Sequence, residues 1–261
     1  MTPQQRLDFR RMLLASVAFG ATTGIFNSTL GNYLHDVHAF DASARGWVEL
    51  PRELPGFLVI ATVGLLAARY REGRAMATAM LVTTLGAVGM ALVAPSPWLA
   101  VLWIFVWSSG DHMNFVLEGP LGLKLARRGG EGRRLGQFGG AKNLGGLLGA
   151  GTVFLVARLL GDDYRFFYLL AAVLALLAAW NFGRIETGRH DVRPRAFVWR
   201  RQYGIFYAIS ALFGIRKQIF YVFGTWVLVD IHGVPVSTIA MLMFVGAGLG
   251  VVLRPLLGDV I

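Results

Sequence analysis

Ionisable side chains lie inside long apolar runs of this 261-residue chain, where a charge must find a partner or take part in chemistry. Glu49, Arg52 and Glu53 follow one another at i, i+3 and i+4, which places all three on one face of a helix. A partly desolvated carboxyl beside an arginine can accept a proton. The same three charges can also neutralise one another. The spacing therefore predicts either a proton-accepting gate or a self-neutralising structural cluster.

A second set of polar residues recurs at helical spacing further along the chain. Trp107, Asp111, Asn114 and Glu118 are separated by four, three and four residues and form one stripe along a helix. An unpaired carboxylate at Asp111 in an apolar environment would be protonated or bound to a cation. His112 points about 100° away from this stripe, so we expect a helix contact there rather than a proton relay.

A third set occupies two apolar runs that lie far apart in the sequence. Thr23 and Asn27 form a polar stripe in the first run, and Lys217 and Tyr221 repeat that spacing in a later one. Adjacent residues of a helix point in different directions, so we expect Lys217 to face a cavity and Arg216 to lie at its edge. Two cations there favour an anionic or zwitterionic solute over a cationic one. The alternative that Arg216 or Lys217 pairs with an acid of another helix and has only a structural role stays open.

The composition explains why these residues stand in apolar surroundings. The chain is 55% apolar and 15% charged, whereas a soluble domain carries about 25% charged residues. Apolar helices of about 20 residues cross a bilayer, and we predict eight of them at residues 12–34, 45–68, 75–94, 97–119, 136–158, 163–183, 203–230 and 235–257. A secretory signal is the alternative for the first. The absence of Cys excludes disulfides, thiolate catalysis and cysteine-ligated metal sites.

The basic residues are distributed unevenly between the predicted loops. Of 25 lysines and arginines, 17 fall in the N-terminal segment and alternate loops and three in the loops of the opposite side. This asymmetry predicts a cytoplasmic N-terminus in a bacterial-type inner (plasma) membrane. It also accounts for the net charge of +10 without a nucleic-acid partner.

The sequence repeats itself at an offset of 194 residues. Eleven identities fall within the 52 positions from 16 to 67, among them Gly20 with Gly214, Asp36 with Asp230 and His38 with His232. The offset aligns the first predicted helix with the seventh, the second with the eighth, and the loops between them with each other. This alignment indicates two parallel six-helix bundles. We therefore predict an N-terminal six-helix bundle over residues 1–183, a basic cytoplasmic linker over 184–202 and the first two helices of a second bundle over 203–261.

These features resemble the major facilitator superfamily of secondary transporters. The six-plus-six arrangement, the basic linker and the segment from Gly64 to Arg74 are similar to that family, and Gly64, Arg69 and Arg74 fall on its motif between helices 2 and 3. Ala68 stands where the family usually has Asp. Helix 4 lacks the usual Arg, and helix 5 lacks the Pro of the antiporter pattern. The resemblance implies an all-α polytopic bundle whose helices 1, 4, 7 and 10 line a central cavity.

The repeat also bears on the length of the chain. Gly258 matches Gly64, and the chain ends three residues later, so we expect a C-terminally truncated transporter without helices 9–12. Small residues at i, i+4, namely Gly145 with Gly149 and Gly246 with Gly250, predict close helix contacts. Lys142 and Arg254 lie on the same faces and either reach the interface or hold an inner gate.

The predicted function is transport of a small polar solute by alternating access, coupled to a proton or counter-ion. The expected solute-binding residues are Thr23, Asn27, Asp111, Asn114, Arg216, Lys217 and Tyr221, and the expected coupling or gating residues are Glu49, Arg52, Glu53, Glu118, Gly64, Arg69 and Arg74. No phosphate-cradling loop occurs, and we expect no cofactor, no metal and no enzyme activity. The oligomeric state is open, with a monomer expected. The alternatives are a polytopic enzyme acting on a lipid-linked substrate and a non-transporting binding protein or remnant.

Overall fold

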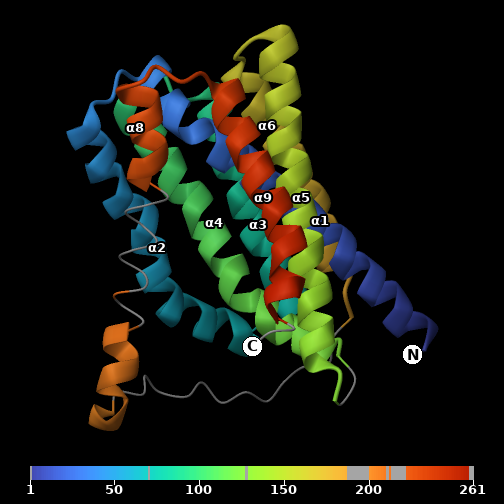
Figure 1. Ribbon diagram of the computed structural model, residues 1–261. Coiled ribbons are helices and arrows are strands. Elements are labelled where there is room, and N and C mark those ends of the chain that lie inside the picture. Colours follow the sequence, from blue (N-terminus) through green and yellow to red (C-terminus); the bar gives the residue numbers. More distant parts are fainter. Residues whose placement is uncertain are drawn as a thin grey trace.

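The computed structural model describes residues 2–69, 71–126, 129–186, 200–209, 212 and 222–258, with the side chains of 60–69 and 250–258 left aside. Within these ranges the chain is helical and contains no strand. The elements are α1 (Pro3–Asn32), η1 (Tyr33–Val37), α2 (Ala42–Arg69), α3 (Glu72–Leu92), α4 (Pro97–Lys124), α5 (Glu131–Leu160), α6 (Tyr164–Gly183), η2 (Arg201–Tyr203), α8 (Gly224–Asp230) and α9 (Val236–Gly258). The long helices stand side by side as a bundle, with α1 beginning and α9 ending at its lower end (Figure 1).

Helix α1 starts nine residues before the predicted span because its first turn is capped. Thr2 accepts a hydrogen bond from the backbone N–H of Gln5, and the Gln5 side chain accepts one from the N–H of Thr2. This capping box and Pro3 at the first helical position satisfy the requirements of a helix N-terminus. The helix therefore begins before the predicted apolar span, which starts at residue 12 within α1.

Helix α1 lies at the centre of the packing, against α5 and α6, while α3 packs against α4 and α6 and α9 packs against α5. The contact of α1 with α5 depends on glycine. A Cβ atom on Gly20 would lie 1.9 Å from the carbonyl oxygen of Lys142, and one on Gly145 would lie 2.0 Å from the carbonyl oxygen of Val17. In the described part of the chain, the expected close contact at Gly246 is not found, since a Cβ there would meet nothing within 4 Å.

Three apolar clusters fill the bundle, and two of them lie toward its two ends. The first joins α1, α3, α5 and α6 near the start of α1 and includes Met12, Phe138 and Phe182. The second joins α1, α4 and α6 near the end of α1 and includes Tyr33 and Tyr168. We call the end where α1 begins the basic end and the end where α1 finishes the opposite end. Between the two clusters the bundle carries its polar residues.

Among the described residues, four helices are long and apolar enough to cross a membrane: the continuous helix Pro3–Val37, then Glu72–Leu92, Glu131–Leu160 and Tyr164–Gly183. They correspond to the predicted spans at 12–34, 75–94, 136–158 and 163–183. Helix α4 is not among them because Asp111, His112 and Asn114 lie within its length. Leucines of these helices, such as Leu81, Leu155 and Leu176, are exposed on the bundle surface, as expected where lipid contacts protein.

The predicted span at 203–230 is described only in part. Residues 204–209 are helical, and α8 covers Gly224–Asp230. Arg216, Lys217 and Tyr221, which we expected to bind solute, lie outside the described residues. The repeat relation between this span and α1 therefore stays a prediction.

Candidate functional site

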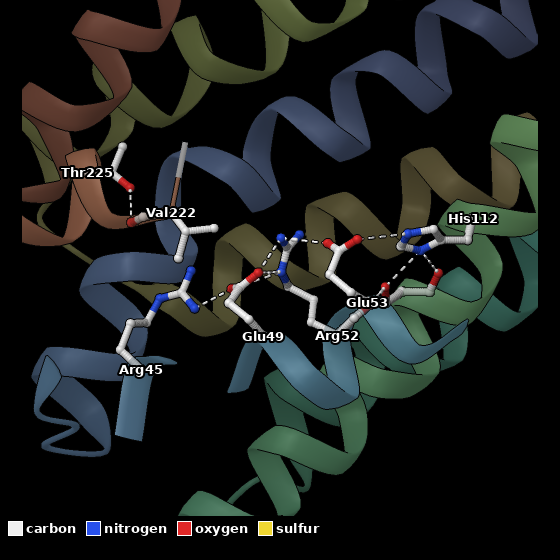
Figure 2. Close-up of polar contacts among 8 residues, drawn as sticks. Arg45, Glu49, Arg52, Glu53, His112, Val222 and Thr225 are labelled. Carbon is white, nitrogen blue, oxygen red and sulfur yellow. Dashed lines mark hydrogen bonds and ion pairs between the residues drawn. The ribbon is translucent and has the colours of Figure 1, made fainter. Parts of the chain in front are cut away.

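Four charged residues of α2 form a chain of ion pairs along one face of that helix (Figure 2). Arg45 donates to Glu49. The Nε of Arg52 lies 2.8 Å from Oε2 of Glu49, and Nη2 of Arg52 lies 2.7 Å from Oε1 of Glu53. The i, i+3, i+4 spacing in the sequence places these groups together. Arg45 was not among the expected site residues, although its spacing of four from Glu49 places the two on one helix face.

The chain of charges continues from α2 to α4 through His112. Its Nε2 lies 3.5 Å from Oε2 of Glu53, and its Nδ1 lies 3.0 Å from Oγ of Ser108. The Ser108 hydroxyl in turn donates to the backbone carbonyl of Arg52. A Cβ on Gly56 would lie 2.8 Å from Cδ2 of His112, so glycine makes room for the ring. The imidazole is thus a helix contact, as expected, but it also joins the charge network, which periodicity alone did not indicate.

A cavity of about 440 Å³ opens beside this network. Its walls come from α1, α2, α4, α5, α8 and α9, which include elements of both predicted bundles. The cavity is lined by Thr23, Asn27, Leu30, Gly31, Arg45, Arg52, Glu53, Trp107, Asp111, His112, Phe115, Lys142, Val222, Thr225 and Met243. The structure therefore brings together five of the expected binding or coupling residues from three helices: Thr23, Asn27, Arg52, Glu53 and Asp111.

Asp111 differs from the other acids of the cavity. Within the described part of the chain it makes no hydrogen bond or ion pair, whereas Glu49 and Glu53 are held by Arg52. The cations that act on Asp111 through space are Lys142, His112 and Arg52. Asp111 therefore offers the cavity a carboxyl group that a solute or a proton can bind without displacing a partner.

Lys142 of α5 also lines the cavity. Its Nζ lies 3.1 Å from Oε2 of Glu118 on α4 and 4.3 Å from the centre of the Phe19 ring. The same lysine lines a second cavity of about 200 Å³ between α1, α5 and α9. Glu118, which we expected to act in gating, thus ties α4 to α5. The close approach of α1 to α5 at Gly20 fixes the backbone of this lysine.

Asn114 does not lie with the other members of the predicted α4 stripe. It is fully buried, and its Nδ2 donates to the carbonyl oxygen of Gly110 at 3.1 Å and contacts the sulfur of Met80 at 3.0 Å. Asn114 therefore faces α3 and is not among the residues that line the cavity, so its expected contact with solute stays a prediction. Trp107 has its indole ring stacked on Phe26 with centroids 3.5 Å apart, and this pair forms an aromatic wall.

The remaining expected gating residues lie at the basic end. Gly64 and Arg69 belong to the last turns of α2, where side chains are not described. Arg74 is exposed near the start of α3. None of these three residues lines the cavity in the described part of the chain. They belong to the end of α2 and the start of α3, as expected of the loop between the second and third helices.

At the opposite end, polar contacts join η1 to the start of α6 and to α8. Asp36 accepts a hydrogen bond from the Tyr164 hydroxyl at 2.6 Å and contacts Nδ1 of His35 at 2.8 Å. Nε2 of His35 lies 3.9 Å from Asp230 of α8. Burial, together with the charge of Asp36, raises the pKa of Asp162. These contacts link η1 to α6 and α8 at that end.

A helical bundle with a polar cavity in its middle is the architecture of secondary membrane transporters. The chain belongs to the Major Facilitator Superfamily, whose sequence model matches residues 12–261. The expected family and the all-α fold class are thereby confirmed. A search of curated protein sequences finds no match.

Solved transporter structures share the fold at low sequence identity. A bacterial homolog of the human lysosomal transporter Spinster, in an inward-facing and unoccupied conformation, matches with a TM-score of 0.72 and 16% identity over 97% of this chain and 60% of that one. A D-xylose–proton symporter matches with a TM-score of 0.64 and 14% identity, over 95% and 67% of the two chains. A POT family transporter matches with a TM-score of 0.56 and 14% identity, over 94% and 53%. The chain thus spans about 60% of the length of the Spinster homolog.

Proposed function

We propose that this protein moves a small polar solute across the membrane by alternating access, with the cavity beside Asp111 as its binding site. The observation that carries the proposal is the position of Asp111, a carboxyl group without an ion-pair partner among the described residues, at the wall of a cavity of about 440 Å³. Ionisable groups within membrane spans commonly mark solute or ion pathways. Thr23 and Asn27 supply neutral hydrogen-bonding groups in the same cavity.

The charges around the cavity support coupling to a proton. Glu49, Glu53, Asp111 and Glu118 bring four negative charges, and Arg45, Arg52 and Lys142 bring three positive ones. With His112 neutral, the network carries one unneutralised carboxylate, which is costly in a low-dielectric environment. A single proton on Asp111 or His112 removes that charge. A D-xylose–proton symporter shares the fold, in line with proton coupling here.

The cavity wall also bears on the solute. It presents Asp111 on α4 and the cations Arg52 and Lys142 on α2 and α5. A zwitterionic solute would place its ammonium group at Asp111 and its acidic group near the cations. The expectation that the solute is anionic depends on Arg216 and Lys217, and an anionic solute therefore remains part of the proposal.

The topology follows the positive-inside rule in this proposal. The basic end lies in the cytoplasm of a bacterial-type inner membrane, residues 1–183 form the first bundle, and residues 203–261 begin the second. Gly64, Arg69, Arg74 and Glu118 serve the gating that the family resemblance implies. The protein acts as a monomer without a cofactor.

The proposal is tested by reconstituting the purified full chain into liposomes. Currents or internal pH are recorded while amino acids, carboxylates and sugars are added, with and without an imposed pH gradient. We expect at least one zwitterionic or anionic solute to drive proton movement that depends on the gradient. Absence of gradient-dependent flux for every solute class would overturn the proposal, and turnover of a lipid-linked substrate would replace it by an enzyme.

A further inference from the structure

A second charged site lies at the basic end, far from the cavity beside Asp111. It is a pocket of about 220 Å³ among the first turns of α1 and α3 and the last turn of α6. Four arginines line it: Arg11 from α1, Arg71 and Arg74 from the start of α3, and Arg184 at the end of α6. Glu186 is the acid on its wall. We call this the basic-end pocket.

A buried acid holds part of the pocket in place. Asp8 is 2% exposed, and its Oδ1 accepts hydrogen bonds from Nη1 of Arg11 at 3.2 Å and from the backbone N–H of Glu186 at 3.4 Å. Nη1 of Arg11 also donates to the carbonyl oxygen of Arg184 at 2.5 Å. These bonds fix the end of α6 to α1, so one wall of the pocket is formed before any ligand binds.

The other wall carries positive charge that the protein leaves uncompensated. Neither Arg71 nor Arg74 has a carboxylate partner in the part of the chain that the structure describes. The neighbouring acid Glu72 is engaged by Lys124 of α4. Ala68 stands where an acid is usual in the family, so the sequence supplies no acid there either. The pocket therefore presents two guanidinium groups that can bind an anion.

The surroundings of the pocket place it at the edge of the lipid-facing surface. Trp180, one turn before Arg184, is 60% exposed, and the Arg184 guanidinium lies 3.7 Å above its ring. Val173, Leu176 and Leu177 continue the exposed apolar surface along α6. Tryptophan and arginine at the end of a membrane helix are typical of the headgroup region. A ligand in the pocket would lie at the depth of lipid phosphates.

We propose that the basic-end pocket binds a phosphate group, supplied either by an anionic phospholipid or by soluble phosphate. Arginine suits phosphate because its planar fork donates two parallel hydrogen bonds. Basic pockets between membrane helices recognise lipid headgroups by the same chemistry. The site acts independently of the solute cavity, so this proposal does not rest on the transport function.

Trp180 provides the measurement. The purified full chain is placed in mixed micelles that contain either phosphatidylglycerol or phosphatidylcholine brominated near the headgroup, and fluorescence quenching is recorded. The difference between the wild type and Trp180→Phe isolates the signal of Trp180. We expect brominated phosphatidylglycerol to quench Trp180 at about fivefold lower concentration than brominated phosphatidylcholine. Equal quenching by the two lipids would overturn the proposal.

Variants of the pocket separate the site from general charge attraction. Arg71→Gln/Arg74→Gln should abolish the preference for phosphatidylglycerol. Arg71→Lys/Arg74→Lys keeps the charge and should retain part of the preference, which shows that the substituted positions do not prevent folding. Arg6→Gln/Arg10→Gln removes equal charge from exposed positions of α1 at the same end and should leave the preference unchanged. Equal losses in the two glutamine variants would overturn the proposal.

Inorganic phosphate distinguishes the two sources of the ligand. It is titrated into wild-type protein that is already quenched by brominated phosphatidylglycerol, with chloride at equal ionic strength as the control. Recovery of Trp180 fluorescence by phosphate alone supports the proposal with soluble phosphate as a ligand. Quenching that persists through the titration, and is still lost in Arg71→Gln/Arg74→Gln, supports it with the lipid as the ligand.

Discussion

Asp111 is the residue on which the transport proposal depends most directly. Its neighbours in the cavity, Arg52, Glu53 and Lys142, all have ion-pair partners, and Asp111 has none among the described residues. Replacing a paired group disturbs the network as well as the chemistry. Replacing Asp111 removes a carboxyl group with little loss of packing, so its variants report on function.

Asp111→Asn should remove proton coupling and leave the fold intact. The amide keeps the size of the side chain but can neither accept the proton nor hold a positive charge. We expect gradient-driven flux to fall about 100-fold, a typical loss for a positioned acid or base. The measurement is solute-driven proton movement in liposomes, with Asp162→Asn at the opposite end as the control. Undiminished flux in Asp111→Asn would remove this residue from the mechanism.

Gly56→Ala tests the contact between α2 and His112. The added methyl would lie 2.8 Å from Cδ2 of the imidazole, so the ring must move away from Glu53. We expect a loss of stability of about 1–3 kcal/mol, as for other overpacked sites, read as a lower midpoint of thermal unfolding in detergent. Gly119→Ala is the matched control in α4, because a Cβ there meets nothing within 4 Å. Equal midpoints for the two variants would contradict the tight fit.

At the scale of elements, the spacing within one helix predicted the site better than contacts between helices. Glu49, Arg52 and Glu53 were placed together from their positions alone, because i, i+3 and i+4 residues share a face in any α-helix. His112 makes the expected helix contact but also lines the cavity, whereas Asn114 faces α3. Which side of α4 meets α2 and which meets α3 depends on tertiary packing, and a single sequence does not contain that information in its periodicity.

The beginning of α1 shows a similar division. Hydropathy located the apolar part of the helix, but the capping box of Thr2 and Gln5 determines where the backbone becomes helical. The additional turns bring Asp8 and Arg11 to the basic-end pocket. The family and the helical fold were predictable because they depend on composition and the repeat, whereas this pocket depends on where three helix ends meet.

The pairing of α1 with α5 makes a prediction at the same scale. Gly20→Ala would place a methyl 1.9 Å from a backbone oxygen of Lys142, and backbone cannot rotate away as a side chain can. The helices must separate, and we expect a loss of about 3 kcal/mol together with displacement of Lys142 from the cavity. Resistance to unfolding in a denaturing detergent measures this loss.

Gly140→Ala on α5 is the control for that variant. A Cβ at this position meets nothing within 4 Å, and alanine favours a helix over glycine by up to about 1 kcal/mol. We expect unchanged or slightly increased stability. If Gly20→Ala unfolded no more easily than Gly140→Ala, the close α1–α5 contact would be refuted.

For the whole molecule, the proposed alternating access gives the polar contacts at the opposite end a role to test, namely closing the cavity on that side. Nδ2 of Asn32 donates to the carbonyl oxygen of Val234 at 2.9 Å, and His35 lies between Asp36 and Asp230. Asp36 and Asp230 are equivalent positions of the sequence repeat. The predicted first bundle and the described part of the predicted second bundle are therefore joined at this end by few polar contacts among the described residues, as a closure that opens again would require.

Asn32→Ala/Asp230→Asn should increase access to the cavity from the opposite end. The lost hydrogen bond of Asn32 is worth about 1 kcal/mol, which shifts an open–closed equilibrium about fivefold, and the 3.9 Å contact of Asp230 with His35 is too long to count as a second hydrogen bond. The chain has no cysteine, so a membrane-impermeant maleimide reacts only with the cysteine introduced by Thr225→Cys at the cavity wall. The rate of this labelling measures how accessible the cavity is. We expect about fivefold faster labelling in the triple variant than in Thr225→Cys alone. An unchanged rate would show that these contacts do not close the cavity.

The ion pairs inside α2 have a consequence for how the protein enters the membrane during synthesis. Arg45, Glu49, Arg52 and Glu53 sum to zero charge and bind one another within a single helix. Isolated charges at the middle of a membrane helix oppose insertion by about 2.5–3.5 kcal/mol each. Helix α2 can form its neutral set as soon as it coils, before α4 with His112 has left the ribosome. The later helix completes a network that has already been carried into the bilayer.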